Sequence, residues 1–258
     1  MGIGDELMCA GEARKRAAGD RTKRYGMLDK FDRPKAHFIW DHCDFVAPAG
    51  APNDGNIGYV NGMRPYIAGK EPNRWVWREY EPYPAALRIP EHLKKLRAFA
   101  EGMIVFNPGI KAKASPNKDW GRARWRSLIS RSERRGWLQL CEPGAERITG
   151  ATHYVTGSFY EALALLSGAR AAVLHEGALH HAAASLDVPA VVLYGGYISP
   201  RVTGYNGQKS LFVHSEQYPL GCGHRLPCEH CARAMAQISP DDVLRALDEL
   251  LAERRAHA

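Results

Sequence analysis

The second half of this 258-residue chain alternates short apolar runs with longer segments of helical periodicity. The runs are short enough to be buried strands, and the longer segments repeat apolar residues at helical spacing. Such alternation is typical of a parallel sheet covered by helices on both faces, so we predict an α/β fold. The predicted strands are Met103–Asn107, Trp137–Cys141, Ala171–His175 and Pro189–Gly195, and the predicted helices are Gly121–Arg135, Phe159–Gly168, Gly177–Leu186 and a last one starting at Ser239.

Two of these helices carry start signals. Ser158 followed by Glu161 matches a capping box, in which a hydroxyl and a carboxylate satisfy reciprocal backbone amides. Ser239 followed by Pro240 and two acids also favours a helix start. Because ligands of parallel sheets bind beyond the carboxyl ends of the strands, functional residues are expected in the loops that follow the predicted strands.

The first hundred residues are irregular by comparison, because frequent prolines interrupt any long element. We predict a helix from about Asp5 to Ala18 and short strands at Ala36–Trp40 and Asp44–Ala47. Between Gly50 and Pro90 we expect mostly loops, anchored by aromatic residues.

The net charge of +7 favours an anionic partner, such as a phosphorylated sugar, a nucleic acid or an anionic lipid. Nine basic residues and two acids lie between Lys111 and Arg135, so this stretch alone carries the whole excess. It is either a solvated helix face or a binding surface. Trp120 and Trp125 lie among its arginines, where they either stack on nucleic-acid bases or anchor the helix in the core.

The sequence predicts a cytoplasmic protein without a membrane span. No stretch approaches the ~18 consecutive apolar residues that a spanning helix needs. The first residues have no charged segment followed by an apolar core, as a secretory signal would. Six cysteines in a chain of this length fit a reducing compartment better than a disulfide framework.

The segment from His175 to Gly196, HEGALHHAAASLDVPAVVLYGG, is the most specific part of the sequence. A strand delivers His175 and Glu176 to its carboxyl end, and Gly177 permits a tight turn into a helix. The free amides and the dipole of such a helix favour a phosphate at its N-terminus. The alternative is an ordinary strand–helix–strand unit with capping and core residues.

This segment resembles glycosyltransferase family 9, which includes the ADP-heptose:lipopolysaccharide heptosyltransferases. Members carry D-T-G-x-x-H after a strand, where this chain has His175–His180, followed by a Val-Pro-Val-type strand at Val188–Gly195. Gly2–Asp5 resembles the family's I-G-D loop, and Lys118–Trp120 with the later Trp125 resembles its K-x-W…W pattern. His-Glu replaces the usual Asp-Thr, so the donor specificity of heptosyltransferases is not implied.

The resemblance implies two Rossmann-like domains facing a cleft, the GT-B type, with a reduced N-terminal domain over residues 1–100 and a donor-binding domain over residues 101–258. The chain begins at the I-G-D loop without the strand that normally leads into it, so either the native start lies upstream or the N-terminal domain is reduced. The implied activity is inverting transfer of a sugar from a nucleotide-sugar donor to a hydroxyl of an anionic surface glycan or a lipopolysaccharide-like acceptor. The alternatives are transfer to a modified nucleic-acid base and a non-catalytic nucleic-acid-binding protein.

In the resembling family Asp5 would be the general base, although a helix cap is an equal explanation. Lys118 would bind the donor diphosphate, with Lys113 and Lys111 as alternatives, and Glu142 would bind the ribose or base unless it is only a surface residue. No cofactor is expected for catalysis, since no Asp-x-Asp motif is present. The donor-binding residues implied by the resemblance are Lys113, Lys118, Glu142, His175, Glu176, Gly177, Ala178, His180, Gly195 and Gly196.

A cysteine-rich stretch precedes the last helix. Cys222, Cys228 and Cys231 have His224 and His230 between them. Three thiolates and one imidazole, for which we expect His224, could form a tetrahedral structural zinc site. The spacing does not match the well-known zinc fingers, so buried reduced thiols are the alternative.

Overall fold

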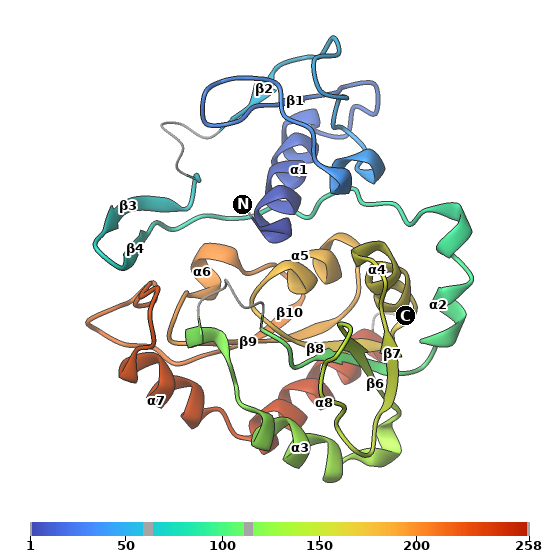
Figure 1. Cartoon of the computed structure of the whole chain (residues 1–258), viewed down its shortest axis with the longest axis vertical. Coiled ribbons are helices and arrows are strands. Elements are labelled where there is room, and N and C mark those ends of the chain that lie inside the picture. Colours follow the sequence, from blue (N-terminus) through green and yellow to red (C-terminus); the bar gives the residue numbers. More distant parts are fainter. Residues whose placement is uncertain (1, 59–63, 111–115, 257–258) are drawn as a thin grey trace.

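The computed structural model describes residues 2–58, 64–110 and 116–256. Its centre is a six-stranded parallel sheet with the order β10-β9-β8-β5-β6-β7 (Figure 1). This order places the first strand of the sheet in the middle, as in a doubly wound Rossmann-type fold. The strands are β5 (Ile104–Asn107), β6 (Trp137–Cys141), β7 (Thr152–Val155), β8 (Ala171–His175), β9 (Ala190–Gly195) and β10 (Gln208–Phe212).

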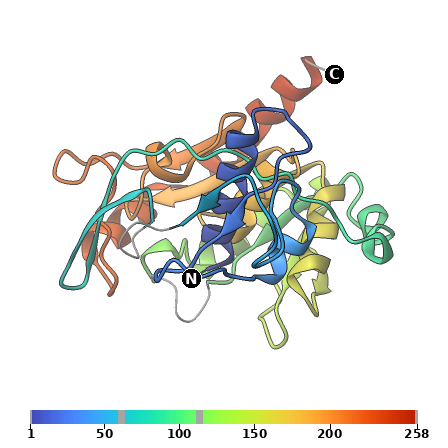
Figure 2. The same cartoon turned by 90° about the horizontal axis from the view of Figure 1, so that it is seen from above.

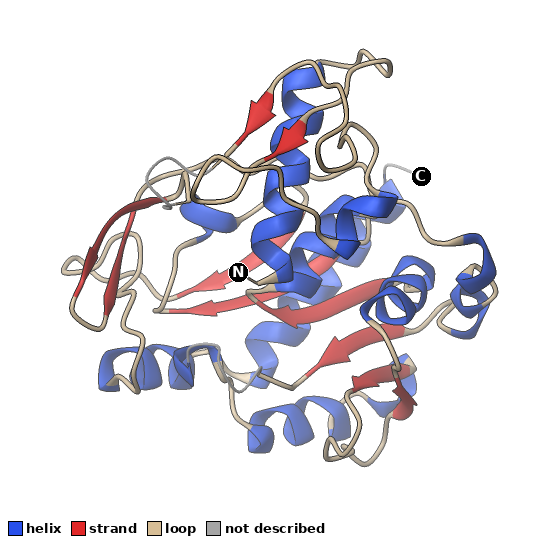
Figure 3. Ribbon diagram, turned by 45° about the horizontal axis from the view of Figure 1, so that its top comes forward, coloured by secondary structure: helices blue, strands red, loops and turns tan. Residues whose placement is uncertain are grey.

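Helices cover both faces of this sheet (Figure 3). On one face lie α4 (Phe159–Gly168) and α5 (Ala178–Ser185), and on the other lie α3 (Arg122–Ser130), α7 (Glu229–Gln237) and α8 (Pro240–Ala256) (Figure 1). Each face has its own apolar core, because alternate strand residues point to opposite sides. The predicted α/β class and the central strands are confirmed. Short elements fill the connections: α2 (Leu96–Phe99), α6 (Pro200–Thr203) and 3-10 turns at Glu91–Leu93, Pro116–Lys118 and Glu133–Arg135.

Among the elements that were not predicted from the sequence are two strands and one helix of the C-terminal part. The outermost strands β7 and β10 lie at the sheet edges, and they carry polar residues that give no apolar run. The helix α7 is polar apart from a narrow buried stripe. Edge strands and half-exposed helices bury fewer apolar side chains than central strands do, so the hydrophobic pattern that marks them in the sequence is weak.

The predicted helix starts are partly corrected. At α8, Ser239 and Asp242 form a reciprocal cap, with the Ser239 hydroxyl accepting from the Asp242 amide and Asp242 accepting from the Ser239 amide. At α4 the Ser158 hydroxyl accepts from the Glu161 amide, but the Glu161 carboxylate accepts from the Gly157 amide. The box at α4 is therefore shifted by one residue on its carboxylate side.

The N-terminal part consists of one long helix, α1 (Ile3–Ala17), and two small sheets. The predicted strand at residues 36–40 is wrong: Phe38–His42 is a 3-10 turn, begun by His37, whose ring accepts from the Ile39 amide. The predicted strand at residues 44–47 is reduced to a single bridge at Val46. A hairpin occupies part of the expected loop region. The two sheets pair β1 (Gly26–Met27) with β2 (Asn56–Ile57) and β3 (Ile67–Glu71) with β4 (Arg74–Trp77).

Helix α1 joins the N-terminal part to the sheet. It lies across α5, and viewed from above it crosses the C-terminal part (Figure 2). Its residue Leu7 belongs to the same apolar core as Leu174 of β8 and Val192 of β9. No helix in the described ranges is long and apolar enough to cross a membrane.

Candidate functional site

The sheet order locates the site. β5 lies between β6 and β8, so the chain leaves the carboxyl ends of β5 and β8 in opposite directions. A ligand-binding crevice forms at such a switch point in open α/β sheets. The loop after β5 carries Lys118, and the loop after β8 carries Glu176.

Lys118 and Glu176 form an ion pair at this point. The Glu176 side chain is buried, and the Lys118 side chain is 19% exposed. The Lys118 ammonium also lies 5.2 Å from the ring centroid of Tyr197, within cation–π range. Burial raises the pKa of Glu176, but the nearby charges, that of Lys118 first, and the hydrogen bonds from Lys118 and Thr203 together outweigh burial and hold that pKa below its usual value. The pair therefore consists of an ammonium and a carboxylate.

His180, the last residue of the family motif, caps the helix α5. Its Nδ1 accepts from the Gly177 amide at 2.9 Å, so its Nε2 carries the proton and donates to the Thr203 carbonyl at 2.9 Å. Gly177 has φ 158° and ψ −161°, a combination that side chains disfavour. The amides left for an anion at this end are those of the next residues, beginning with Ala178.

His175 and His181 are buried and neutral. The His175 Nε2 accepts from the Trp120 amide at 3.2 Å, and its ring meets the edge of Trp125. His181 Nδ1 lies 2.8 Å from the hydroxyl of Tyr205. Desolvation lowers the pKa of both rings, that of His175 to about 4. His175 thus packs in the core behind the site.

Glu176, His180 and His181 place ligand atoms within 4.8 Å of one another. They do not fit a metal ion, because an ammonium already occupies the Glu176 carboxylate and both nitrogens of His180 are hydrogen-bonded. A cation added beside Lys118 would also be repelled by it.

Asp5 lies in the first turn of α1 and faces the same region. Its Oδ2 accepts from the Gly2 amide at 2.9 Å and lies 2.5 Å from an Arg64 nitrogen, and its Oδ1 accepts from the Tyr66 hydroxyl. Residue Gly4 brings α1 against α5, since a Cβ built there would lie 2.8 Å from the His181 ring and 3.4 Å from the Ala178 amide nitrogen. Asp5 is therefore both a helix cap and a neighbour of the α5 N-terminus.

The remaining predicted donor residues are dispersed. Glu142 is exposed after β6. Gly195 and Gly196 pack against α7, because a Cβ would lie 2.7 Å from Met235 at the first position and 2.8 Å from the His230 ring at the second. The structure gives these glycines a packing role. Lys111 and Lys113 lie outside the described residues.

The basic segment is largely paired with acids. Arg122 and Arg126 contact Glu146, and Arg131 and Arg135 contact acids of α8 at 2.7 and 2.5 Å. Trp120 and Trp125 are fully buried and pack edge to face. The tryptophans are core anchors, and the arginines hold α3 to its neighbours, so this helix offers no stacking platform for nucleic acid.

The cysteine-rich loop forms a compact cluster. Cys222, Cys228, His230 and Cys231 place their ligand atoms within 4.8 Å of one another, and the sulfurs of Cys222 and Cys231 are 2.8 Å apart. The hydrogen bond from Cys231 lowers the pKa of Cys222, which favours a thiolate. Three sulfurs and an imidazole suit zinc or ferrous iron.

The imidazole in this cluster corrects the expectation from the sequence. His230 lies in the first turn of α7 beside Cys231, whereas His224 lies in the preceding loop and forms a backbone bridge with Arg74. Spacing in the sequence could not distinguish the two, because the loop reverses between them.

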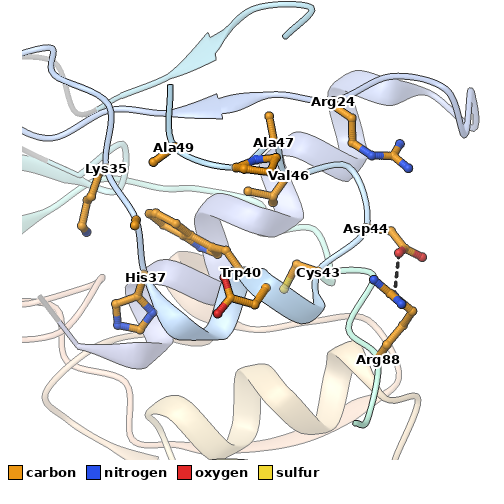
Figure 4. Close-up of a pocket in the computed structure, with 13 residues that line it drawn as sticks. Arg24, Lys35, His37, Trp40, Cys43, Asp44, Val46, Ala47, Ala49 and Arg88 are labelled. Atoms are coloured by element: carbon orange, nitrogen blue, oxygen red, sulfur yellow. Dashed lines mark ion pairs between the residues drawn. The ribbon is translucent and has the colours of Figure 1, made fainter. Parts of the chain in front are cut away.

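A separate hollow of about 170 Å³ lies in the N-terminal part (Figure 4). Lys35 and His37 line one end, Arg24 and Arg88 the other, and Trp40 lies between them. Lys35 connects this hollow with the first turn of α1, because its ammonium lies 2.5 Å from the buried Glu6 carboxylate.

Several residues of these sites carry no motif. Arg64 and Tyr66 hold Asp5, Tyr197 lies under the Lys118 ammonium, and Asn117 bonds the cysteine loop. They come from loops or from the N-terminal hairpin, where no periodicity or fixed spacing marks them.

Comparisons with known proteins show the family of the chain. The family model "Glycosyltransferase family 9 (heptosyltransferase)" matches residues 78–231. Lipopolysaccharide heptosyltransferase 1 of Pseudomonas aeruginosa is 30% identical over 148 residues, which cover 53% of this chain and 39% of that protein. The chain thus matches well under half the length of this curated relative.

One solved structure shows the same fold. The iron-containing dodecameric glycosyltransferase TibC from enterotoxigenic Escherichia coli aligns with a TM-score of 0.62 at 14% identity, over all of this chain and 75% of that one. E. coli ADP-heptose lipopolysaccharide heptosyltransferase II aligns with a TM-score of 0.48 at 18% identity, over 75% and 60% of the two chains. The family model covers more than half of the residues, and the chain therefore belongs to glycosyltransferase family 9.

Proposed function

We propose that this protein transfers a sugar from a nucleotide-diphosphate donor to a hydroxyl of an anionic glycan acceptor, with inversion at the anomeric carbon. The observation that carries the proposal is that Lys118 meets Glu176 just before α5, while the first turn of α1, which carries Asp5, packs against the N-terminus of the same helix. A cation and free helix amides suit a diphosphate, and a carboxylate beside them suits proton abstraction.

The donor diphosphate would lie between Lys118 and the amides that begin α5. As the bond from the anomeric carbon to the diphosphate oxygen breaks, negative charge grows on the leaving group, and both features stabilise it. Glu176 holds the ammonium at this place before the donor arrives. Hydrogen bonds from the donor phosphates would then share the cation with Glu176.

Asp5 would accept the proton of the acceptor hydroxyl while that oxygen attacks the anomeric carbon. Arg64 and Tyr66 fix the orientation of its carboxylate. The proton thus moves to Asp5, and the nucleoside diphosphate leaves with the electron pair of the broken bond.

The N-terminal hollow supports an anionic acceptor. Three cationic side chains and the edge of Trp40 line it, against two acids, and its Lys35 end adjoins the helix turn that carries Asp5. An acceptor bound there through its charged groups would extend its hydroxyl toward α1.

A metal ion in the cysteine cluster is part of this proposal. TibC, which shares the fold, is described as iron-containing. Here three thiols and an imidazole offer a soft donor set remote from Asp5 in the sequence, on a loop and the start of α7. Such an ion would be structural, and the transfer step itself uses only the side chains and amides named above.

Titration with a panel of nucleoside diphosphates and nucleotide sugars tests the donor site. We expect saturable binding that Lys118→Ala and Gly177→Val weaken strongly but leave measurable, because the first removes the cation and the second strains the turn. The variant Lys118→Ala/Glu176→Gln removes the buried charge that the single change leaves unpaired, and Lys94→Ala at an exposed ion pair is the matched control. No binding across the panel by the intact protein would refute the transferase.

Transfer assays then test the base. Asp5→Asn keeps the shape of the side chain and one accepting oxygen but removes its basicity, so we expect turnover to fall by about 10²- to 10⁴-fold with donor affinity unchanged. Unchanged turnover would remove Asp5 from the mechanism.

A further inference from the structure

The cysteine-rich loop lies between the two parts of the molecule. On one side the Cys222 and Gly223 amides donate to the Gly196 and Tyr197 carbonyls at 2.9 and 3.0 Å. On the other side the Gly223 carbonyl accepts from the Trp75 amide of β4 at 2.9 Å. Gly223 fits only because it lacks a side chain, since a Cβ would lie 2.0 Å from the Trp75 oxygen.

Asn117 attaches the donor loop to this cysteine-rich loop. Its Nδ2 donates to the carbonyls of His224 and Leu226 at 2.7 and 2.8 Å, and its Oδ1 accepts from the Cys228 amide at 2.9 Å. An asparagine amide has two donor hydrogens and a two-lone-pair acceptor, so both donors and one acceptor position serve this one loop. The side chain is buried, as expected for a structural hydrogen-bond centre.

The cysteine-rich loop contacts the neighbours of Lys118 both at its backbone and at its ammonium. Its backbone follows Asn117 directly. Its ammonium lies over the ring of Tyr197, whose carbonyl accepts from Gly223. A change in the path of the cysteine-rich loop would therefore move the backbone of Lys118 and the surface under its charge together.

We propose that a thiolate-preferring divalent ion, held by Cys222, Cys228, His230 and Cys231, fixes this loop, and that Asn117 transmits its order to Lys118. Asn117 is a positioning residue in this account. The proposal rests on the donor role of Lys118 given above. Four ligands close the loop from Cys222 to Cys231, so the ion replaces the packing that a loop with few apolar side chains lacks.

Elemental analysis of the purified protein tests the ion. We expect one zinc or iron ion per chain, and the visible spectrum of tetrahedral thiolate-bound cobalt when Co²⁺ is added after chelation. Cys228→Ser and His230→Ala should lose the metal and the spectrum, whereas Cys9→Ser and His224→Ala should keep both. A metal-free protein that also gives no cobalt spectrum would overturn the proposal.

Calorimetric titration with the tightest nucleoside diphosphate of the panel tests the link to Lys118. Chelation and Asn117→Ala should each weaken binding about 10-fold, within the usual range for coupled sites. Asn117→Ala should retain the ion, and Asn53→Ala, in an exposed loop, is the matched control. Because Asn117 acts through Lys118, the double variant Asn117→Ala/Lys118→Ala should bind no more weakly than Lys118→Ala.

The failures are distinguishable. Equal affinity of the intact, chelated and Asn117→Ala proteins would overturn this inference and leave the transferase intact. Additive losses in the double variant would likewise remove Asn117 as a positioning residue for Lys118. No nucleotide binding by the intact protein would overturn both proposals, even with one ion per chain.

Discussion

At the residue scale, Glu176 changes the character of the phosphate site. Family members carry Asp-Thr where this chain has His175 and Glu176, and the exchange puts a buried carboxylate onto Lys118. A buried carboxylate without a cation would be costly, so the two residues stabilise each other. The site then presents less net positive charge to a donor than Lys118 alone would.

His175 is also a buried titratable side chain, but unlike Glu176 it stays neutral. Its Nε2 accepts from the Trp120 amide, and its Nδ1 has no hydrogen-bond partner among the described residues, so protonation gains nothing there. Burial lowers its pKa from 6.5 to about 4. As pH falls below 6.5, the unfolded chain binds a proton at this position and the folded protein does not, so stability falls with pH.

We predict that His175→Phe reduces the acid sensitivity of the fold. Between about pH 7 and pH 4.5 the intact protein should lose about 2.5 kcal/mol more than the variant, since the phenyl ring does not titrate. Urea denaturation at both pH values measures the difference. His175→Phe also loses the hydrogen bond from the Trp120 amide, but this loss lowers the stability of the variant at both pH values. It therefore cancels when each protein's stability at one pH is subtracted from its own stability at the other. An equal pH dependence of both proteins would contradict the assignment.

At the element scale, the position of α1 determines whether a site exists. Its glycines allow close approach: Gly4 meets α5, and a Cβ at Gly11 would lie 1.8 Å from the Tyr83 carbonyl oxygen. The obstacle at Gly11 is backbone, which cannot rotate away as a side chain can. The helix is therefore held at one distance from the segment around Tyr83, and its first turn, which carries Asp5, is held against α5.

We predict that Gly11→Ala destabilises the fold by about 3 kcal/mol, at the upper end of the usual cost of overpacking. Alanine favours helices, so the sign itself separates packing from helix propensity. Gly69→Ala in β3 is the control, because its Cβ would meet nothing closer than 3.9 Å. Denaturant melts measure both changes, and a stabilised Gly11→Ala protein would contradict the packing.

At the scale of the whole molecule, the N-terminal part and the sheet share one apolar core. Leu7 and Ile39 of the N-terminal part cluster with Leu174 and Val192 of the sheet. The Trp77 indole also donates to the Tyr197 carbonyl at 3.0 Å across the two parts. Neither part buries its apolar face alone, because residues of both belong to one apolar cluster.

We therefore predict a single cooperative unfolding transition. Far-ultraviolet circular dichroism reports mainly the sheet and helices of the C-terminal part. A fluorophore on Lys15→Cys would report α1 alone in a Cys9→Ser/Cys228→Ser background, whose other cysteines are buried. Both signals should give the same denaturant midpoint and slope. Separate midpoints would show that the two parts unfold independently.

Much of the C-terminal fold was predictable because its signal is local. Central strands such as β5, with Val105, and β9, with Val191, are buried on both faces, so they form apolar runs in the sequence. The caps of α4 and α8 are also recognisable, because their residues lie within a few positions of one another. The N-terminal part was less predictable. The residues from Phe38 to His42 are apolar enough for a strand, but the His37 cap and the packing on α1 select a 3-10 turn.

The sequence by itself determined the α/β class, the strand that presents Glu176, the glycine turn of α5 and the cysteine set, because each depends on periodicity or on neighbours along the chain. Only the tertiary structure decided which partners these groups meet. In the folded protein Lys118 forms an ion pair with Glu176, and His230 rather than His224 lies in the cysteine cluster. Trp120 and Trp125 are buried, and Asn117 is hydrogen-bonded to the cysteine-rich loop. These contacts span tens of residues, and loop closure leaves no periodic trace of which distant groups will meet.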